Sequence, residues 1–133
     1  MEDKAQQEIL FKLSMYEQQM NNIGQQLQAI EKAIVDVSSI NFGLDELKGK
    51  TGEEILASIG KGIFIKAKLV SEELIVDIGG KNLVEKSIPE TQKIIKEQLK
   101  KLEEIKRELE GNLEEMNNQI QNIILEHQKK QGK

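Results

Sequence analysis

The sequence predicts an α+β fold in which a long antiparallel α-helical coiled coil carries two central β-hairpins. Two observations favour it: apolar residues recur at alternating spacings of four and three near both ends of the chain, and at a spacing of two in the middle. Only 3% of the 133 residues are aromatic and 32% are charged, a composition typical of exposed helices with a narrow apolar seam.

The N-terminal segment, residues 1–40, is predicted to be a coiled-coil helix from about Glu2 to Ser39. Its apolar side chains alternate at four and three without a break, which is the a/d heptad pattern and places them all on one seam. The seam residues are Ile9, Leu13, Tyr16, Met20, Ile23, Leu27, Ile30, Ile34 and Val37.

The C-terminal segment, residues 87–133, is predicted to be a second coiled-coil helix followed by a short tail. Ser87 is expected to begin this helix by accepting a hydrogen bond from the Glu90 amide while the Glu90 side chain reaches back, a capping box. Pro89 falls in the first turn, where no intrahelical donor is lost. The seam residues are Ile95, Leu99, Leu102, Lys106, Leu109, Leu113, Met116, Ile120, Ile123 and His127.

The middle segment, residues 41–86, is predicted to hold a loop and two β-hairpins. Strands at 53–60 and 62–70, and at 73–80 and 82–87, are rich in β-branched residues and are bounded by glycine. Hairpins of this size leave unpaired edges, so other copies or related chains are expected to complete the sheet. The apolar residues expected to join this assembly are Ile55, Ile59, Ile63, Ile65, Leu74, Val76, Ile78 and Val84.

The hairpins resemble those of the prefoldin family, and in particular its α-class subunit. Residues 55–68 match the family's apolar strand, its Gly-any-Gly turn, and a second strand in which a basic residue precedes a small one. Residues 75–79 and 84–87 match the second hairpin and the Glu-Lys-Ser entry to the last helix. The resemblance covers essentially the whole chain, and two hairpins indicate the α class because the β class carries one.

The resemblance implies a single domain over residues 1–133, within a hexamer of two α and four β subunits whose hairpins form a double β-barrel. It implies a molecular chaperone subunit, a holdase, that binds unfolded polypeptides at the coiled-coil tips. Such a complex prevents aggregation and transfers its clients to a group II chaperonin without ATP, and with no cofactor. The family is cytosolic, and a chain with no Cys fits a reducing, cytoplasmic compartment.

The sequence departs from the family pattern in two places. Ala57 and Ser58 stand where Val-Pro is usual, and in the second turn Lys81 and Leu83 stand where a Gly and an aromatic residue are usual. These departures concern turn geometry and the choice of partner subunit.

Apolar residues outside the seam gather where the free ends of the two predicted helices meet. Leu10 and Phe11 lie off the seam of the first helix, and Ile124 and Leu125 lie off that of the second, whereas the flanks of the middle turns are polar. Two interpretations remain open: these side chains widen the seam at a fraying end, or they form a surface that binds non-native chains. The client-binding tip would comprise Ile9, Leu10, Phe11, Leu13, Ile120, Ile123, Ile124 and Leu125.

Other functions fit the sequence less well. A net charge of -4 argues against binding nucleic acid, and no run approaches the roughly 18 apolar residues of a membrane span. With no Cys nucleophile and a single His near the chain end, an enzyme is not predicted, and no metal site is expected. The alternative function is a coiled-coil scaffold or a filament-forming, prefoldin-like structural protein.

Gly49-Lys50-Thr51 matches the ending of a phosphate-binding loop. That loop requires four residues between its first Gly and the Gly-Lys-Ser/Thr ending. Here the nearest upstream glycine is Gly43, and five residues separate it from Gly49. The segment also follows a predicted helix rather than a buried strand. We therefore interpret it as the exit from the first helix, not as a nucleotide site.

Overall fold

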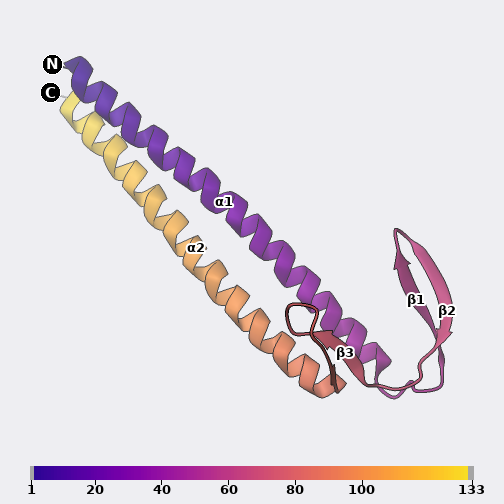
Figure 1. The fold of residues 1–133 in the computed structure, drawn as a ribbon. Coiled ribbons are helices and arrows are strands. Elements are labelled where there is room, and N and C mark those ends of the chain that lie inside the picture. The colour runs from indigo at the N-terminus through magenta and orange to yellow at the C-terminus, as the bar shows by residue number, and fades with distance from the viewer. Residues whose placement is uncertain (1, 132–133) are drawn as a thin grey trace. The chain divides into compact units, whose positions relative to one another are not determined.

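The computed structural model describes residues 2–131, with side chains for residues 4–129. The chain forms two long helices and four strands, which confirms the predicted α+β fold. Figure 1 traces the path of the chain through these elements. By its internal contacts it divides into a coil unit, Met1–Ile34 with Lys101–Lys133, and a hairpin unit, Val35–Lys100. The elements are α1 (Glu2–Leu47), β1 (Glu54–Gly60), β2 (Ile63–Lys68), β3 (Leu74–Asp77), β4 (Leu83–Lys86) and α2 (Ile88–Gln131).

In the coil unit, α1 and α2 lie side by side and run in opposite directions (Figure 1). Each predicted seam side chain in this unit is half-buried or buried, and Ile23 is the most enclosed at 8% exposure. Lys106 occupies a seam position but extends its Nζ to the edge, 3.8 Å from Glu31 and 3.9 Å from Glu110. The apolar stem is thus covered while the ammonium group stays hydrated.

In the hairpin unit, α1 is longer than the sequence predicted. The helix was expected to end near Ser39, but it continues to Leu47. Asn41 occupies the seam position after Val37, and this polar residue interrupts the apolar repeat without ending the helix. Leu44 resumes the seam at 8% exposure, so the predicted boundary at residue 40 was wrong by about two turns.

A small apolar core forms where the ends of the two helices and the second hairpin meet. Leu44, Ile88 and Ile95 are 8%, 2% and 6% exposed. Covering a side chain of this size contributes about 1.5–3 kcal/mol. The partly buried residues around them are Val37, Leu47, Leu74 and Leu99.

Helix α2 begins at the Ser87 cap as predicted, but among the described residues only the Ser87 half of the capping box is formed. The Ser87 hydroxyl accepts a hydrogen bond from the Glu90 amide at 3.2 Å, and the Thr91 hydroxyl donates to the Ser87 carbonyl at 2.9 Å. An N-cap of this kind contributes about 1 kcal/mol. At the other end, α2 continues to Gln131, so the part of the predicted tail before that residue is helical; residues 132–133 lie outside the described chain.

The four strands form two separate antiparallel hairpins, as predicted: hairpin 1 (β1–β2) and hairpin 2 (β3–β4). In hairpin 1 the turn residues Lys61 and Gly62 have φ angles of 48° and 80°, typical of a two-residue turn that follows the strand twist. Hydrogen bonds between Leu69 and both Gly52 and Glu53 extend this ladder past the strand ends.

Neither helix in the described part of the chain has an apolar stretch long enough to cross a bilayer.

Candidate functional site

The end of the coil unit near both chain termini carries exposed apolar side chains. Leu10 and Phe11 on α1 are each 65% exposed, and Ile124 and Leu125 on α2 are 41% and 55% exposed. We call these four residues the apolar band. The other predicted tip residues, Ile9, Leu13, Ile120 and Ile123, are half-buried because they belong to the seam.

Heptad positions explain why the band stays uncovered. Leu10 and Ile124 each follow a seam residue and occupy position e, and Phe11 and Leu125 occupy position f. In an antiparallel pair the e positions of both helices lie on one side of the seam, whereas f positions point away from it. The band therefore covers one side of the pair and extends onto the outer faces. The described e positions nearer the middle of the coil unit are polar or glycine: Glu17, Gly24, Glu31, Glu103, Glu110 and Asn117.

The opposite side of the same pair is a shallow groove with a different character. Positions g of both helices face it, including Lys12 and Gln19 from α1 and Gln119 and Glu126 from α2. Met15 also lines this groove and is 46% exposed. Tyr16 and Ile123 of the seam line the groove as well, so this side of the tip combines polar and apolar side chains. Met15 was not among the predicted tip residues, although its polarizable, flexible side chain suits contacts with varied partners.

The hairpins carry a second set of exposed apolar side chains. Of the residues predicted to join an assembly, four are exposed: Ile59, Ile63, Ile65 and Ile78. The other four are half-buried: Ile55, Leu74, Val76 and Val84. Leu74 already packs against the core of its own chain. Half of the predicted set is therefore partly covered within the single chain, and the other half is exposed.

Four further exposed apolar residues on the strands were missed by the sequence analysis. They are Leu56 (67% exposed), Phe64 (59%), Ile75 (70%) and Leu83 (65%). Each lies on the opposite face of its hairpin from the predicted residues, because side chains alternate along a strand. The sequence could have revealed them, because apolar residues stand at successive positions in these strands, and such a run indicates a strand with two apolar faces.

Sequence and structure comparisons relate this architecture to known proteins. A family model described as prefoldin subunit matches residues 16–133, which is most of the chain. The chain belongs to the prefoldin family.

The relatives are α-class subunits from archaea. Prefoldin subunit alpha of Methanobrevibacter smithii is 31% identical over 114 residues, covering 85% of this chain and 78% of the relative. Prefoldin subunit alpha of Pyrococcus horikoshii is 28% identical over 134 residues, covering 98% and 90%. The chain is therefore an α-class prefoldin subunit, part of a chaperone family and not an enzyme.

A solved structure of filamentous PFD from Methanocaldococcus jannaschii has the same fold. It superposes with a TM-score of 0.75 at 21% identity, covering 86% of this chain and 97% of that chain.

In the turn of hairpin 2, Lys81 stands where prefoldins usually have a glycine, and the backbone accommodates it. Lys81 adopts a φ of 63°, the left-handed region in which the usual glycine has no steric penalty. Asp77 supports the turn by accepting a hydrogen bond from the Gly79 amide at 2.9 Å, and the Asn82 amide donates to the Gly79 carbonyl at 3.1 Å. The hairpin therefore closes without the second glycine.

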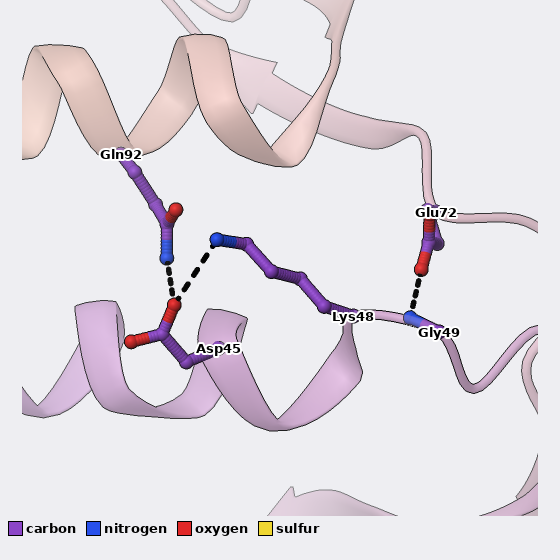
Figure 2. A network of polar contacts seen from close by, with 5 residues as sticks. All are labelled: Asp45, Lys48, Gly49, Glu72 and Gln92. Carbon is purple, nitrogen blue, oxygen red and sulfur yellow. Dashed lines mark hydrogen bonds and ion pairs between the residues drawn. The ribbon is translucent and has the colours of Figure 1, made fainter.

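A polar network joins the end of α1 to the start of α2 (Figure 2). The Asp45 carboxylate accepts a hydrogen bond from the Gln92 amide at 2.7 Å and lies 3.3 Å from the Lys48 ammonium group. The hydrogen bond from Gln92, and to a smaller extent the contact with Lys48, hold the pKa of Asp45 below its ordinary value of 3.8. The carboxylate is therefore charged at neutral pH and ties the two helices together beside the core.

This network predicts that replacing Asp45 lowers the stability of the chain at neutral pH but not at acidic pH. Because the folded-state pKa of Asp45 is lowered, its stabilising contribution is present above the ordinary value of 3.8 and is lost as the pH falls through the folded-state pKa. Asp45→Asn is expected to lower the melting temperature at about pH 7, and the difference from wild type is expected to vanish towards about pH 2. Circular dichroism melts check this, with Glu46→Gln as the control; a pH-independent difference would contradict it.

The segment Gly49-Lys50-Thr51, which resembles the ending of a phosphate-binding loop in sequence, lies beside this network and does not have the structure of such a loop. The Gly49 amide, which would have to face a phosphate, donates to the Glu72 carboxylate instead (Figure 2). The segment leaves a helix and enters β1, whereas a phosphate-binding loop leaves a strand and enters a helix. The hydrogen bond from Gly49 to Glu72 instead joins the two ends of the chain segment that carries hairpin 1.

Proposed function

We propose that this chain is the α subunit of a holdase that binds unfolded polypeptides at its coiled-coil tips, prevents their aggregation and transfers them to a group II chaperonin without ATP. The supporting observation is the apolar band. Its four side chains are 41–65% exposed at the end of a coiled coil whose other described e positions are polar or glycine. A pair of helices that only needed a wider seam would cover these side chains, and Phe11 and Leu125 point away from the seam.

The energetics suit capture followed by release. Covering one Leu or Phe side chain contributes about 1.5–3 kcal/mol, so a single arm binds a client weakly. Several arms on one body act together, because the first contact raises the effective concentration of the client at the others. Each contact remains individually reversible, and no nucleotide hydrolysis is required for release.

The proposed body is a cytoplasmic hexamer of two α and four β subunits, with the hairpins forming a double β-barrel. The exposed Ile59, Ile63, Ile65 and Ile78 support it, because a hairpin with uncovered apolar side chains and free edges is marginal alone. The half-buried Ile55, Val76 and Val84 lie on the faces that a closed barrel would cover further.

The test is a holding assay with the chain co-expressed with a β-class subunit. The purified complex is expected to suppress light scattering by a denatured client equally well with and without ATP, and to release that client to a group II chaperonin. Failure to suppress scattering, or suppression only with ATP, would contradict the proposal.

The second candidate is a filament-forming structural protein, favoured by the description of the similar solved structure as filamentous. Electron microscopy of the chain expressed alone separates the two candidates. Filaments without holding activity would favour the structural role, whereas discrete complexes that hold clients favour the chaperone.

A further inference from the structure

The last two turns of α1, residues 41–47, are helical although their own sequence disfavours a helix. We call these residues the joint. Asn41 stands in the seam, and its Oδ1 atom is buried without a hydrogen-bond donor among the described residues. A buried carbonyl oxygen without a donor disfavours the closed helix. Two residues later comes Gly43, and glycine is one of the weakest helix formers.

Two further features show that the joint is weak for local reasons. A Cβ atom added to Gly43 would meet no described atom within 4 Å, so packing does not explain the glycine. The last turn of the helix contains Asp45 and Glu46 and no basic residue. Carboxylates at this end face the negative pole of the helix dipole, which disfavours the final turn.

The joint is held instead by tertiary contacts at the start of α2. Leu44 packs with Ile88 in the small core, and Leu47 lies at the edge of that core. The Asp45 carboxylate accepts the hydrogen bond from Gln92 at 2.7 Å (Figure 2). A helical segment that depends on so few contacts opens at a lower free energy than the middle of the same helix.

We propose that the joint opens and closes as one unit while the rest of α1 stays helical, and that its opening releases hairpin 1. The joint leads into β1, and among the described residues the core includes Leu74 of hairpin 2 but no residue of hairpin 1. Hairpin 1 is therefore held through its two connections. A segment of the joint's length spans about 10 Å as a helix and roughly 23 Å when extended, so opening lengthens the first connection.

Hairpin 1 moves as a unit when the joint opens. The hydrogen bond from Gly49 to Glu72 keeps the two ends of its segment together, and hydrogen bonds from Gly52 and to Glu53 tie both to Leu69. The second connection, residues 70–73, then serves as the pivot. The inference rests on the proposed role of the hairpins in assembly, because an adjustable hairpin 1 fits neighbouring subunits of more than one geometry.

Hydrogen exchange of the full chain, resolved by residue, tests the opening. The amides of the joint are expected to share one protection factor, at least about tenfold below that of residues 23–30 in the same helix. Ordinary fraying instead gives protection that falls residue by residue towards the helix end. Asn41→Leu removes the unsatisfied carbonyl and is expected to raise protection of the whole joint at least about tenfold. Gly43→Ala is expected to raise it about fivefold.

Gly24→Ala is the matched control. Gly24 lies in the same helix, and a Cβ atom added there also meets no described atom within 4 Å. This variant gains the same helix propensity away from the joint, so it is expected to leave the protection of residues 41–47 unchanged. All three substitutions favour the helix, so a failure to fold does not complicate the comparison.

The release of hairpin 1 is measured by the distance between two spin labels. The chain has no Cys of its own, so Ser58→Cys on β1 and Glu97→Cys on α2, both exposed, give unique attachment sites. Labelled chains are diluted into unlabelled chains, so that only pairs within one chain contribute. A broad distance distribution is expected for the otherwise wild-type chain, and Asn41→Leu is expected to narrow it.

Three results would overturn the inference. They are a protection of the joint equal to that of residues 23–30, a graded protection that does not respond to Asn41→Leu, or a distance distribution that Asn41→Leu leaves unchanged. Exchange and distances are measured within one chain, whereas the holding assay and the mass of the complex test the proposed function. Failure of the joint and failure of the proposed function are therefore distinguishable.

Discussion

Replacing the apolar band with serine, as Leu10→Ser, Phe11→Ser, Ile124→Ser and Leu125→Ser together, is expected to weaken client holding while the complex still assembles. Each residue removed forfeits about 1.5–3 kcal/mol of possible contact with a client, and 1.4 kcal/mol is a factor of ten in affinity. The four residues lie in the coil unit, outside the hairpins proposed to assemble. The seam beneath them, including Ile9 and Ile123, is unchanged and keeps the helices paired.

The measurement is the concentration of complex that halves light scattering by a denatured client. Because the β-class arms remain in the proposed hexamer, we expect an increase of at least about tenfold rather than a complete loss. Ile105→Ser is the matched control, since Ile105 is 42% exposed, like Ile124 at 41%, but lies away from the tip. An unchanged half-suppression concentration, or an equal effect of the control, would refute the tip as the holding surface.

Ile65→Asp is expected to break the oligomer. Ile65 lies opposite Ala57 on the same face of hairpin 1 as Ile55, and it is 53% exposed within the single chain. A neighbouring subunit that covers this face would have to bury an unpaired carboxylate, at a cost of several kcal/mol. Native mass spectrometry of the chain co-expressed with a β-class subunit is therefore expected to show a smaller mass.

The choice of Ile65 separates assembly from folding of the chain. Val76 is half-buried opposite Val84 within hairpin 2, so a charge there would also destabilise the hairpin itself. Val70→Asp is the control, since Val70 is 89% exposed and follows β2 without belonging to it. An intact hexamer with Ile65→Asp would show that the barrel does not cover this face.

The candidate tip could be predicted from sequence to a useful degree. Heptad spacing alone placed Leu10, Phe11, Ile124 and Leu125 off the seam, because a period close to that of the helix assigns each residue to a face. Exposure of the two f positions follows from that assignment. The pattern gave no reason to name Met15, which is exposed beside the groove on the other side of the pair.

The hairpins were less predictable because both faces of each strand are apolar. Alternation identifies which residues share a face but does not say which face another part of the chain covers. Leu74 and Ile75 are adjacent and equally apolar in type; Leu74 packs on the core, and Ile75 is 70% exposed. Only the position of hairpin 2 against Leu44 and Ile88 distinguishes them.

The sequence by itself determined the two helices, the two hairpins, the Ser87 cap and the seam, because each depends on residues within a few positions of one another. The tertiary structure decided where α1 ends. Asn41 breaks the local pattern, and the helix continues because Leu44 packs against Ile88 and Ile95, residues more than forty positions away. The hydrogen bond from Gln92 to Asp45 crosses 47 positions. A contact across such a separation exists only once the helices pair, so no local spacing in the sequence reveals it.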